Sequence, residues 1–315
     1  MKISVIVPCH QNNKIVHECL DTIISQKKDN ELIIACDNFD FDYREATIIK
    51  SHKKLYANGI RNFGAKHATG DYLLFLDSDI ILEEKFFDKL DVFIDENKPK
   101  IVNFPTRAEK SKNVFANYKG LKESYQTDLL VKKNKENPNI KIPFYGYAVL
   151  FRKEVFEKLN GWPENNSYSF IMEHEEFQKI IYRENVKMDI AQNIKVDHYH
   201  HKNFSLFSNV FYRTGIWTTK KLRNEVEIDL FKSNQNAFIS IISFITTFFV
   251  FFDIKISSYF FLFFLILDNK FIINLLTRTK IYFIFYLMVH ILYFNFIFLG
   301  AIKGTLEYFL SKIKA

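Results

Sequence analysis

The pattern of hydrophobic and polar positions divides the chain into an alternating part and a strongly apolar part. The alternating part has three short apolar runs typical of buried strands: residues 3–7, "ELIIACD" and "YLLFLD". Between them, "KIVHECLDTIISQ" and "YANGIRNFGAKHA" carry apolar residues at helical spacing. Strands that alternate with helices predict a mainly parallel sheet covered on both faces, so we expect an α/β fold.

The pattern continues after the third strand. Residues 83–96 predict another helix, "KIVNFP" a strand, and "IPFYGYAVLF" a further strand. The lysine- and asparagine-rich residues 132–141 predict an exposed loop.

Three apolar segments follow residue 232, at 237–252, 256–267 and 281–302. A membrane span needs roughly 20 apolar residues, so the third is long enough, the first is marginal and the second is too short. Asp253 and Lys255 interrupt the first two, which favours a hairpin, a re-entrant pair or helices in the membrane interface. A buried helical subdomain is the alternative, but the density of Phe favours membrane contact. We predict a catalytic domain at 1–232 and a membrane-associated helical region at 233–315.

Composition narrows the classes of partner. A net charge of +7 and a pI near 9.0 suit contact with phosphates or acidic lipids. The sequence has neither an arginine-rich run with interleaved aromatics nor zinc-finger spacing, so we expect no nucleic-acid partner. Cys9, Cys19 and Cys36 form no Cys-x-x-Cys pair, which fits a reducing, cytosolic environment. The N-terminus enters a strand pattern at once, so we expect no signal peptide.

Acidic residues follow two of the predicted strands. Asp37 ends the second strand and Asp77 ends the third, and the carboxyl ends of parallel strands border one ligand crevice. Asp77-Ser78-Asp79 presents two carboxylates from a tight turn, and Mg²⁺ or Mn²⁺ binds such groups together with substrate phosphates. The alternative is that these acids cap the helix that follows.

Five segments together resemble the family 2 glycosyltransferases of the GT-A fold. They are "SVIVPCHQN", "LIIACDN", "IRNFGAKHATGDYLLFLDSDIIL", "YGYAVLFRKEVFEKLNGW" and "MEHEEFQKIIYRENVKM". The resemblance covers about the first 215 residues, and the third segment is its most specific part. It implies a Rossmann-like mixed sheet and a divalent-metal-dependent, inverting transferase of hexosyl type.

The resemblance implies roles on the donor side. Pro8 and Asp37 would line the nucleotide pocket, although Asn38 stands where the family usually has a second Asp. Arg61 would lie near the donor phosphates. In the turn, Asp77 would contact the ribose or the metal and Asp79 would bind the metal. Ser78 between them would lie exposed. The alternatives are a turn residue at Asp37 and a solvated helix charge at Arg61.

The catalytic base is sought in Glu173-His174-Glu175-Glu176. The family usually has an Asp as the base where this chain has His174. An imidazole titrates near pH 6.5 and accepts a proton at neutral pH, while Glu173 and Glu175 are the alternatives. The run could also be acidic residues that favour a helix N-terminus.

Two further segments match the acceptor and metal regions of the family. Gly146 and Trp162 would lie on the acceptor side, where an indole can stack on a sugar, although Trp162 could equally be core. In "VDHYHHKNFSLF", one imidazole would reach the metal or the diphosphate. His198 is the preferred residue and His200 the second choice. An independent site made of the three His lacks an acidic or Cys partner at suitable spacing.

The sequence therefore predicts an inverting glycosyltransferase that moves a sugar from a nucleotide-diphosphate sugar to a lipid-linked or saccharide acceptor in cell-surface polysaccharide biosynthesis. We expect it at the inner membrane, with its catalytic domain on the cytoplasmic side. A non-catalytic membrane scaffold is one alternative. A nucleotidyltransferase is another, but "PCHQNNK" lacks the glycines of its phosphate loop.

Overall fold

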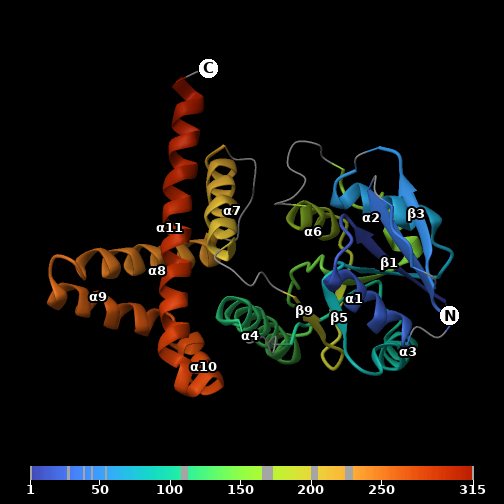
Figure 1. Ribbon diagram of the computed structural model, residues 1–315, viewed down its shortest axis with the longest axis horizontal. Helices are drawn as coiled ribbons and strands as arrows, with labels where there is room; N and C mark the ends of the chain where they lie inside the picture. Colours follow the sequence, from blue (N-terminus) through green and yellow to red (C-terminus); the bar gives the residue numbers. More distant parts are fainter. Residues whose placement is uncertain are drawn as a thin grey trace. The chain divides into compact units, whose positions relative to one another are not determined.

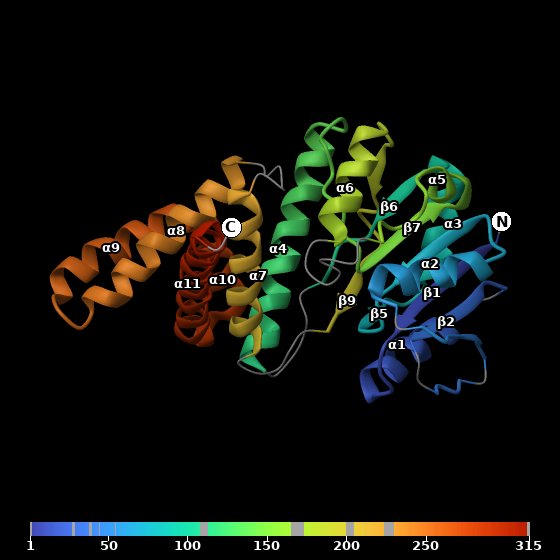
Figure 2. The same ribbon diagram turned by 90° about the horizontal axis from the view of Figure 1, so that it is seen from above.

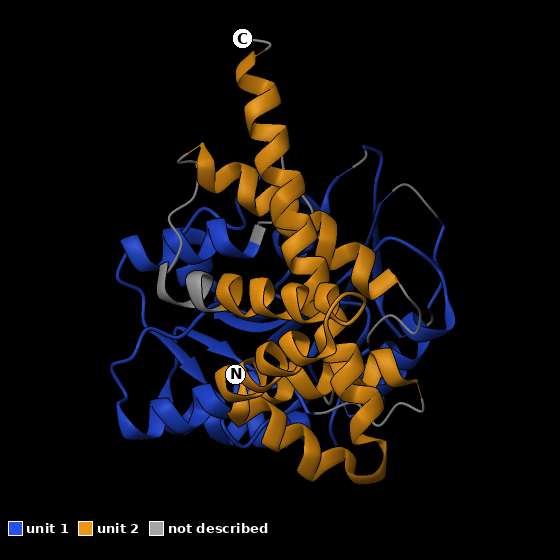
Figure 3. Cartoon of the chain, turned by 90° about the vertical axis from the view of Figure 1, so that its left-hand side faces the viewer, with its two compact units in different colours: residues 1–109, 126–199 blue, residues 110–125, 200–315 orange. Residues whose placement is uncertain are grey.

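The computed structural model describes residues 2–26, 29–37, 40–43, 45–53, 55–107, 113–164, 173–199, 205–223 and 230–313. The chain forms two compact units: unit 1 comprises residues 1–109 and 126–199, and unit 2 comprises residues 110–125 and 200–315 (Figure 3). Helix α4 (Val114–Glu136) begins in unit 2 and ends in unit 1. The domain boundary that we placed at residue 232 stays a prediction.

Unit 1 is built on a seven-stranded sheet with the order β3-β2-β1-β4-β7-β6-β8. The parallel half consists of β1 (Ile3–Cys9), β2 (Glu31–Asp37), β3 (Thr47–Ser51) and β4 (Tyr72–Leu76). The other half consists of β6 (Ile101–Asn103), β7 (Ala148–Arg152) and β8 (Met188–Ile190). Strand β7 runs antiparallel to both β4 and β6. The predicted α/β fold with a mixed sheet is confirmed.

Helices cover both faces of this sheet, as Figure 1 shows. One face packs on α1 (Lys14–Ile24) and α3 (Phe86–Asn97). The other packs on α2 (Ala57–His67), α5 (Lys153–Lys158) and α6 (Glu173–Arg183). Side chains alternate along β1, so that Val5 and Val7 join the first core and Ile6 joins the second.

A second, two-stranded sheet pairs β5 (Ile80–Leu82) with β9 (Val196–His198) in antiparallel register. It carries residues of the candidate site at one end. Neither strand stood out in the sequence, because three residues are too few to show an alternating pattern.

Three predicted elements differ from the structure. The loop predicted at 132–141 is wrong for residues 132–136, which continue α4, where Lys132 and Glu136 form an i,i+4 ion pair at 4.0 Å. The helix predicted from residue 83 begins at Phe86. In "IPFYGYAVLF" only the last four residues belong to a strand, which continues to Arg152.

Unit 2 is helical. It contains α7 (Ser205–Leu222), α8 (Leu230–Phe249), α9 (Ile254–Leu267), α10 (Asn269–Thr279), η1 (Lys280–Tyr282) and α11 (Phe283–Ile313). Helices α8 and α9 form a hairpin (Figure 2), and Asp253 caps α9 by accepting hydrogen bonds from two backbone amides. Helices α7 and α11 approach closely at glycines, since a Cβ on Gly304 would lie 2.1 Å from the carbonyl oxygen of Gly215.

One helical stretch of unit 2 is long and apolar enough to cross a membrane. It runs over Asn269–Ile313, which is 45 residues, with a mean hydropathy of 2.0 in its most apolar window. The apolar helices Asn236–Phe249 and Ile254–Leu267 are shorter than a span. The prediction that only the last apolar segment is long enough is confirmed for the described residues.

Candidate functional site

The candidate site begins at the carboxyl ends of β1, β2 and β4, which are neighbours in the parallel half of the sheet. Pro8 lies in β1 and pairs with Ala35 of β2, and Asp37 ends β2. The Asp37 carboxylate accepts a hydrogen bond from the backbone N–H of Leu55 at 3.1 Å, and His10 lies 3.9 Å from its other oxygen. Asp37, at the crevice edge, therefore fixes the backbone of Leu55 just before α2. Asn38 lies outside the described residues.

Asp77 follows β4 and is held by Arg61 of α2. The Nη2 of Arg61 lies 2.5 Å from the Asp77 carboxylate, and Nη1 donates to Asn58 at 3.2 Å. The Arg61 side chain is only 3% exposed, and its guanidinium lies 4.7 Å from the centre of the Trp162 ring. The interpretation of Arg61 as a solvated helix charge is therefore wrong, because ion pairing and stacking bury it.

The environment of Asp77 alters its acidity. Burial raises the pKa of the Asp77 carboxyl and the neighbouring Asp79 adds to this, whereas Arg61 and His174 act in the opposite direction. The net result is a pKa above the ordinary value of an aspartate. Asp77 thus shares one electrostatic environment with an arginine, a second carboxylate and an imidazole.

The Asp77-Ser78-Asp79 turn is fixed by backbone hydrogen bonds. The Asp77 N–H donates to the carbonyl of Tyr147 at 2.8 Å, and the Ile80 N–H donates to the carbonyl of Asp77 at 3.1 Å. Ser78, predicted to be exposed, is half-buried. The turn leads into β5 and not into a helix, so the interpretation of these acids as helix caps is wrong.

Strand β9 brings His198 to Asp79. His198 pairs with Ile80 in the β5–β9 ladder, and the Tyr199 N–H donates to the carbonyl of Asp79 at 3.0 Å. The Nε2 of His198 lies 3.6 Å from the Oδ2 of Asp79, and Tyr147 stacks on the imidazole with ring centres 5.1 Å apart. Tyr147 is a site residue that sequence reasoning missed; its signal was the aromatic pair in "YGYAVLF". His200 lies outside the described residues.

Asp79 and His198 fit a metal that completes its shell with phosphate. Among the described residues, no group of three or more His, Cys, Asp or Glu gathers into a closed metal site. Neighbouring ligands of one octahedral ion lie about 3 Å apart, so the 3.6 Å separation in this pair is compatible with shared coordination. A carboxylate and an imidazole suit Mn²⁺, and a carboxylate with substrate phosphates suits Mg²⁺.

His174 lies in the first turn of α6, against Gly146. A Cβ on Gly146 would come within 2.3 Å of the His174 Nε2, so the glycine leaves the space that the imidazole fills. The rings of Phe144 and Trp162 flank it at 6.1 and 6.0 Å. Glu175 is half-buried in the same turn, and the side chain of Glu173 lies outside the described residues.

Trp162 belongs to the core. Its side chain is 1% exposed and contacts the rings of Phe75, Phe144 and Phe177. The core interpretation is confirmed, and the contact of Trp162 with an acceptor stays a prediction. So do the donor, base and metal roles of the other residues, whose neighbourhood the structure establishes.

Comparison with known proteins agrees with this arrangement. Residues 4–159 match the model of the family described as Glycosyl transferase family 2. The Staphylococcus aureus (strain N315) protein TarP, a poly(ribitol-phosphate) beta-N-acetylglucosaminyltransferase, is 30% identical over 115 residues, which cover 32% of this chain and 35% of TarP. The uncharacterized glycosyltransferase EpsJ of Bacillus subtilis (strain 168) is 25% identical over 174 residues, half of each chain. The chain thus spans half or less of these curated relatives.

A solved structure has the same fold. It is the mannosyltransferase PcManGT from Pyrobaculum calidifontis in complex with GDP-Man and Mn²⁺, with a TM-score of 0.55, 14% identity, and coverage of 96% of this chain and 86% of that one. The GT-A fold predicted from the resemblance is confirmed, and residues 4–159, with the Asp77–Asp79 turn among them, belong to glycosyl transferase family 2.

Proposed function

We propose that the chain is an inverting glycosyltransferase that moves a hexosyl group from a nucleotide-diphosphate sugar to a lipid-linked or saccharide acceptor in cell-surface glycan biosynthesis. The observation that carries the proposal is the Asp77-Ser78-Asp79 turn at the carboxyl edge of the sheet, with Arg61, His174 and His198 around it. TarP is named for transfer to a poly(ribitol-phosphate), and PcManGT was solved with a nucleotide sugar, which supports this class of donor and acceptor.

On the donor side, Pro8 and Asp37 border the nucleotide pocket and Asp77 contacts the ribose or the metal. Asp79 and His198 would hold Mn²⁺ or Mg²⁺. When bound, that ion would offset the negative charge of the leaving diphosphate. Arg61 pairs with Asp77 and stacks on Trp162, so its main role is to hold Asp77 in place.

On the acceptor side, we assign His174 as the base, with Glu175 and Glu173 as alternatives. His174 takes the proton of the acceptor hydroxyl while the hydroxyl oxygen forms a bond to the anomeric carbon. The bond from that carbon to the diphosphate breaks, and the nucleotide leaves with the electron pair. The nearby carboxylate of Asp77 stabilises the imidazolium that results.

Unit 2 is proposed to attach the enzyme to the inner membrane, with unit 1 in the cytoplasm. Large apolar side chains on α10, η1, α11 and the α8–α9 hairpin are exposed, among them Phe251 (82%) and Ile281 (86%). Many exposed large apolar side chains of this kind are expected at a lipid contact. Attachment there would keep the enzyme at the membrane that carries a lipid-linked acceptor.

The test is nucleotide release by membranes that carry the protein, with a panel of UDP- and GDP-sugars, with and without Mn²⁺. We expect metal-dependent release that is lost in Asp79→Asn and in His174→Ala. Glu84→Gln, an exposed change two residues beyond β5, is the matched control and should release nucleotide normally. Release retained in His174→Ala moves the base to a neighbouring Glu, and the absence of release from every donor contradicts the proposal. Nothing in the structure favours the scaffold or the nucleotidyltransferase.

A further inference from the structure

The β5–β9 ladder that joins Asp79 to His198 is small. It has three residue pairs and lies outside the seven-stranded sheet. A two-stranded ladder is marginally stable by itself, so contacts from outside the ladder must help to hold its register. Asp79 directly precedes β5 and His198 ends β9, so any slip of the ladder separates these two side chains.

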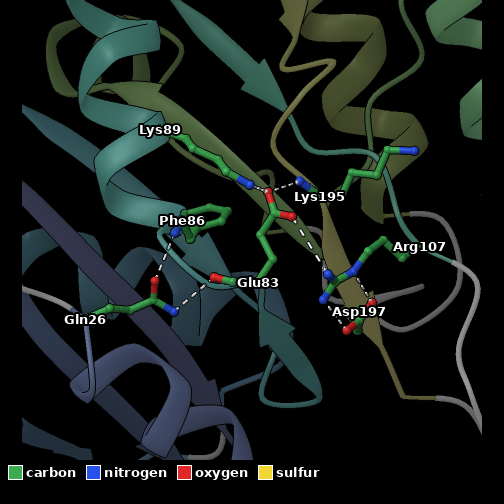
Figure 4. Close-up of polar contacts among 7 residues, drawn as sticks. All are labelled: Gln26, Glu83, Phe86, Lys89, Arg107, Lys195 and Asp197. Carbon is green, nitrogen blue, oxygen red and sulfur yellow. Dashed lines mark hydrogen bonds and ion pairs between the residues drawn. The ribbon is translucent and has the colours of Figure 1, made fainter.

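A charged cluster closes the opposite end of the ladder, as Figure 4 shows. Glu83 directly follows β5. One oxygen of its carboxylate accepts hydrogen bonds from the backbone N–H of Lys195 at 3.0 Å and from the Lys89 ammonium at 2.8 Å. The other oxygen lies 3.8 Å from the Arg107 guanidinium, and the Glu83 side chain is only 12% exposed. The Glu83 carboxylate, just after β5, is thus bonded to the backbone of Lys195, just before β9.

Arg107 binds β9 through both its side chain and its backbone. Its Nε donates to Asp197 at 2.7 Å, and Nη2 bonds the second oxygen of the same carboxylate. The Arg107 N–H also donates to the carbonyl of Val196 at 2.9 Å. Neighbouring residues of a strand point to opposite faces, so this bidentate pair holds β9 from the face opposite His198.

Gln26 connects the same end of the ladder to α1. Its side-chain amide donates to the carbonyl of Glu83 at 3.1 Å and accepts from the N–H of Phe86 at 2.9 Å (Figure 4). The turn that follows β5 is therefore anchored to the main body of unit 1. Strand β9 is held by backbone hydrogen bonds of Val196 with Pro105 and Arg107, and the two charged contacts add to them.

We infer that Glu83 and Arg107 are positioning residues for the metal and diphosphate site: they hold β9 in register with β5 and thereby keep His198 beside Asp79. Neither residue reaches the site, and both act through the backbone of the ladder. This inference rests on the proposed function, because it gives Asp79 and His198 the role of holding the ion. Loss of a residue that orients a metal ligand typically weakens metal binding about 10- to 100-fold.

The experiment measures binding of Mn²⁺ in the presence of inorganic pyrophosphate, with free Mn²⁺ followed by electron paramagnetic resonance. The full chain in detergent is compared with Glu83→Ala, Arg107→Lys and the matched control Glu84→Ala. We expect about 10-fold weaker Mn²⁺ binding in Glu83→Ala, a smaller loss in Arg107→Lys, and wild-type binding in the control. Thermal unfolding of each variant shows that it is folded at the assay temperature.

A charge swap separates positioning from general destabilisation. Arg107→Asp and Asp197→Arg should each weaken Mn²⁺ binding, and the double variant should recover part of the loss because the pair is re-formed. Unchanged Mn²⁺ binding in Glu83→Ala, or a double variant no better than the singles, overturns the inference. If wild-type protein binds no Mn²⁺ with pyrophosphate, the metal-dependent transferase itself is contradicted, which is a different outcome.

Discussion

Gly146→Ala is the sharpest test of the site, because it adds one methyl group against the imidazole of His174. The added Cβ would lie 2.3 Å from Nε2, 2.4 Å from Cδ2 and 2.9 Å from Cε1 of the ring. Comfortable non-bonded contacts begin at about 3.5 Å, so the imidazole must move by about 1 Å. Gly146 is not in the left-handed backbone region, so alanine adds no backbone strain.

The size of the effect follows from that displacement. A misplacement of about 1 Å in a catalytic group costs roughly 100-fold in rate, or about 2.7 kcal/mol of transition-state stabilisation. We therefore expect kcat to fall about 100-fold in Gly146→Ala, with a smaller change in the KM for the donor. The donor-side roles that we propose belong to other residues, such as Asp79.

The assay is steady-state nucleotide release with wild type, Gly146→Ala, His174→Ala and the double variant. Both changes act through one side chain, so the double variant should be no slower than His174→Ala alone. The matched control is Gly64→Ala, whose Cβ would lie 2.5 Å from the Cγ2 of Ile6 in the core. It should lower stability by about 1 to 3 kcal/mol but leave the kcat of the folded enzyme nearly unchanged. A 100-fold loss that Gly146→Ala also causes in the His174→Ala background refutes the reasoning.

Three further changes have defined expectations. Gly304→Ala brings a methyl to 2.1 Å from the Gly215 carbonyl oxygen and should cost about 1 to 3 kcal/mol in the thermal stability of unit 2, measured in detergent. Arg61→Lys removes the planar group that stacks and pairs with Asp77, and should lower kcat/KM at least about 10-fold in nucleotide release, without rescue by added Mn²⁺. Burial raises the pKa of Glu31, but hydrogen bonds from a serine and a threonine and a nearby lysine outweigh it, so the pKa lies below its usual value. The Glu31 carboxylate therefore stabilises the fold above its unfolded pKa of about 4.3, and Glu31→Gln should lower the melting temperature at pH 7 by an amount that shrinks as the pH falls below about 4.

Each of these has an outcome that contradicts it. An unchanged melting temperature in Gly304→Ala would mean that α7 and α11 do not pack through their glycines. Full activity in Arg61→Lys would mean that charge alone holds Asp77. A Glu31→Gln deficit that stays constant from pH 7 to pH 3 would exclude the carboxylate as its source.

The sequence alone determined the local elements and the residues at the ends of the long strands. Short apolar runs predicted β1, β2 and β4, and helical stripes predicted α1 and α2, because each segment is long enough to stand out from the polar residues beside it. The same order placed Asp37 and Asp77 at one edge of a parallel sheet. The length of the last apolar segment likewise predicted the one described helical stretch that could cross a membrane.

Only the tertiary structure decided how distant residues meet at the site. It places His198 beside Asp79 through strands of three residues, and His174 in the space left by Gly146. It also buries Arg61 in an ion pair that its helix pattern did not reveal. These contacts join residues that local periodicity cannot relate, because the free energy of strand pairing and side-chain packing comes from segments far apart in the chain.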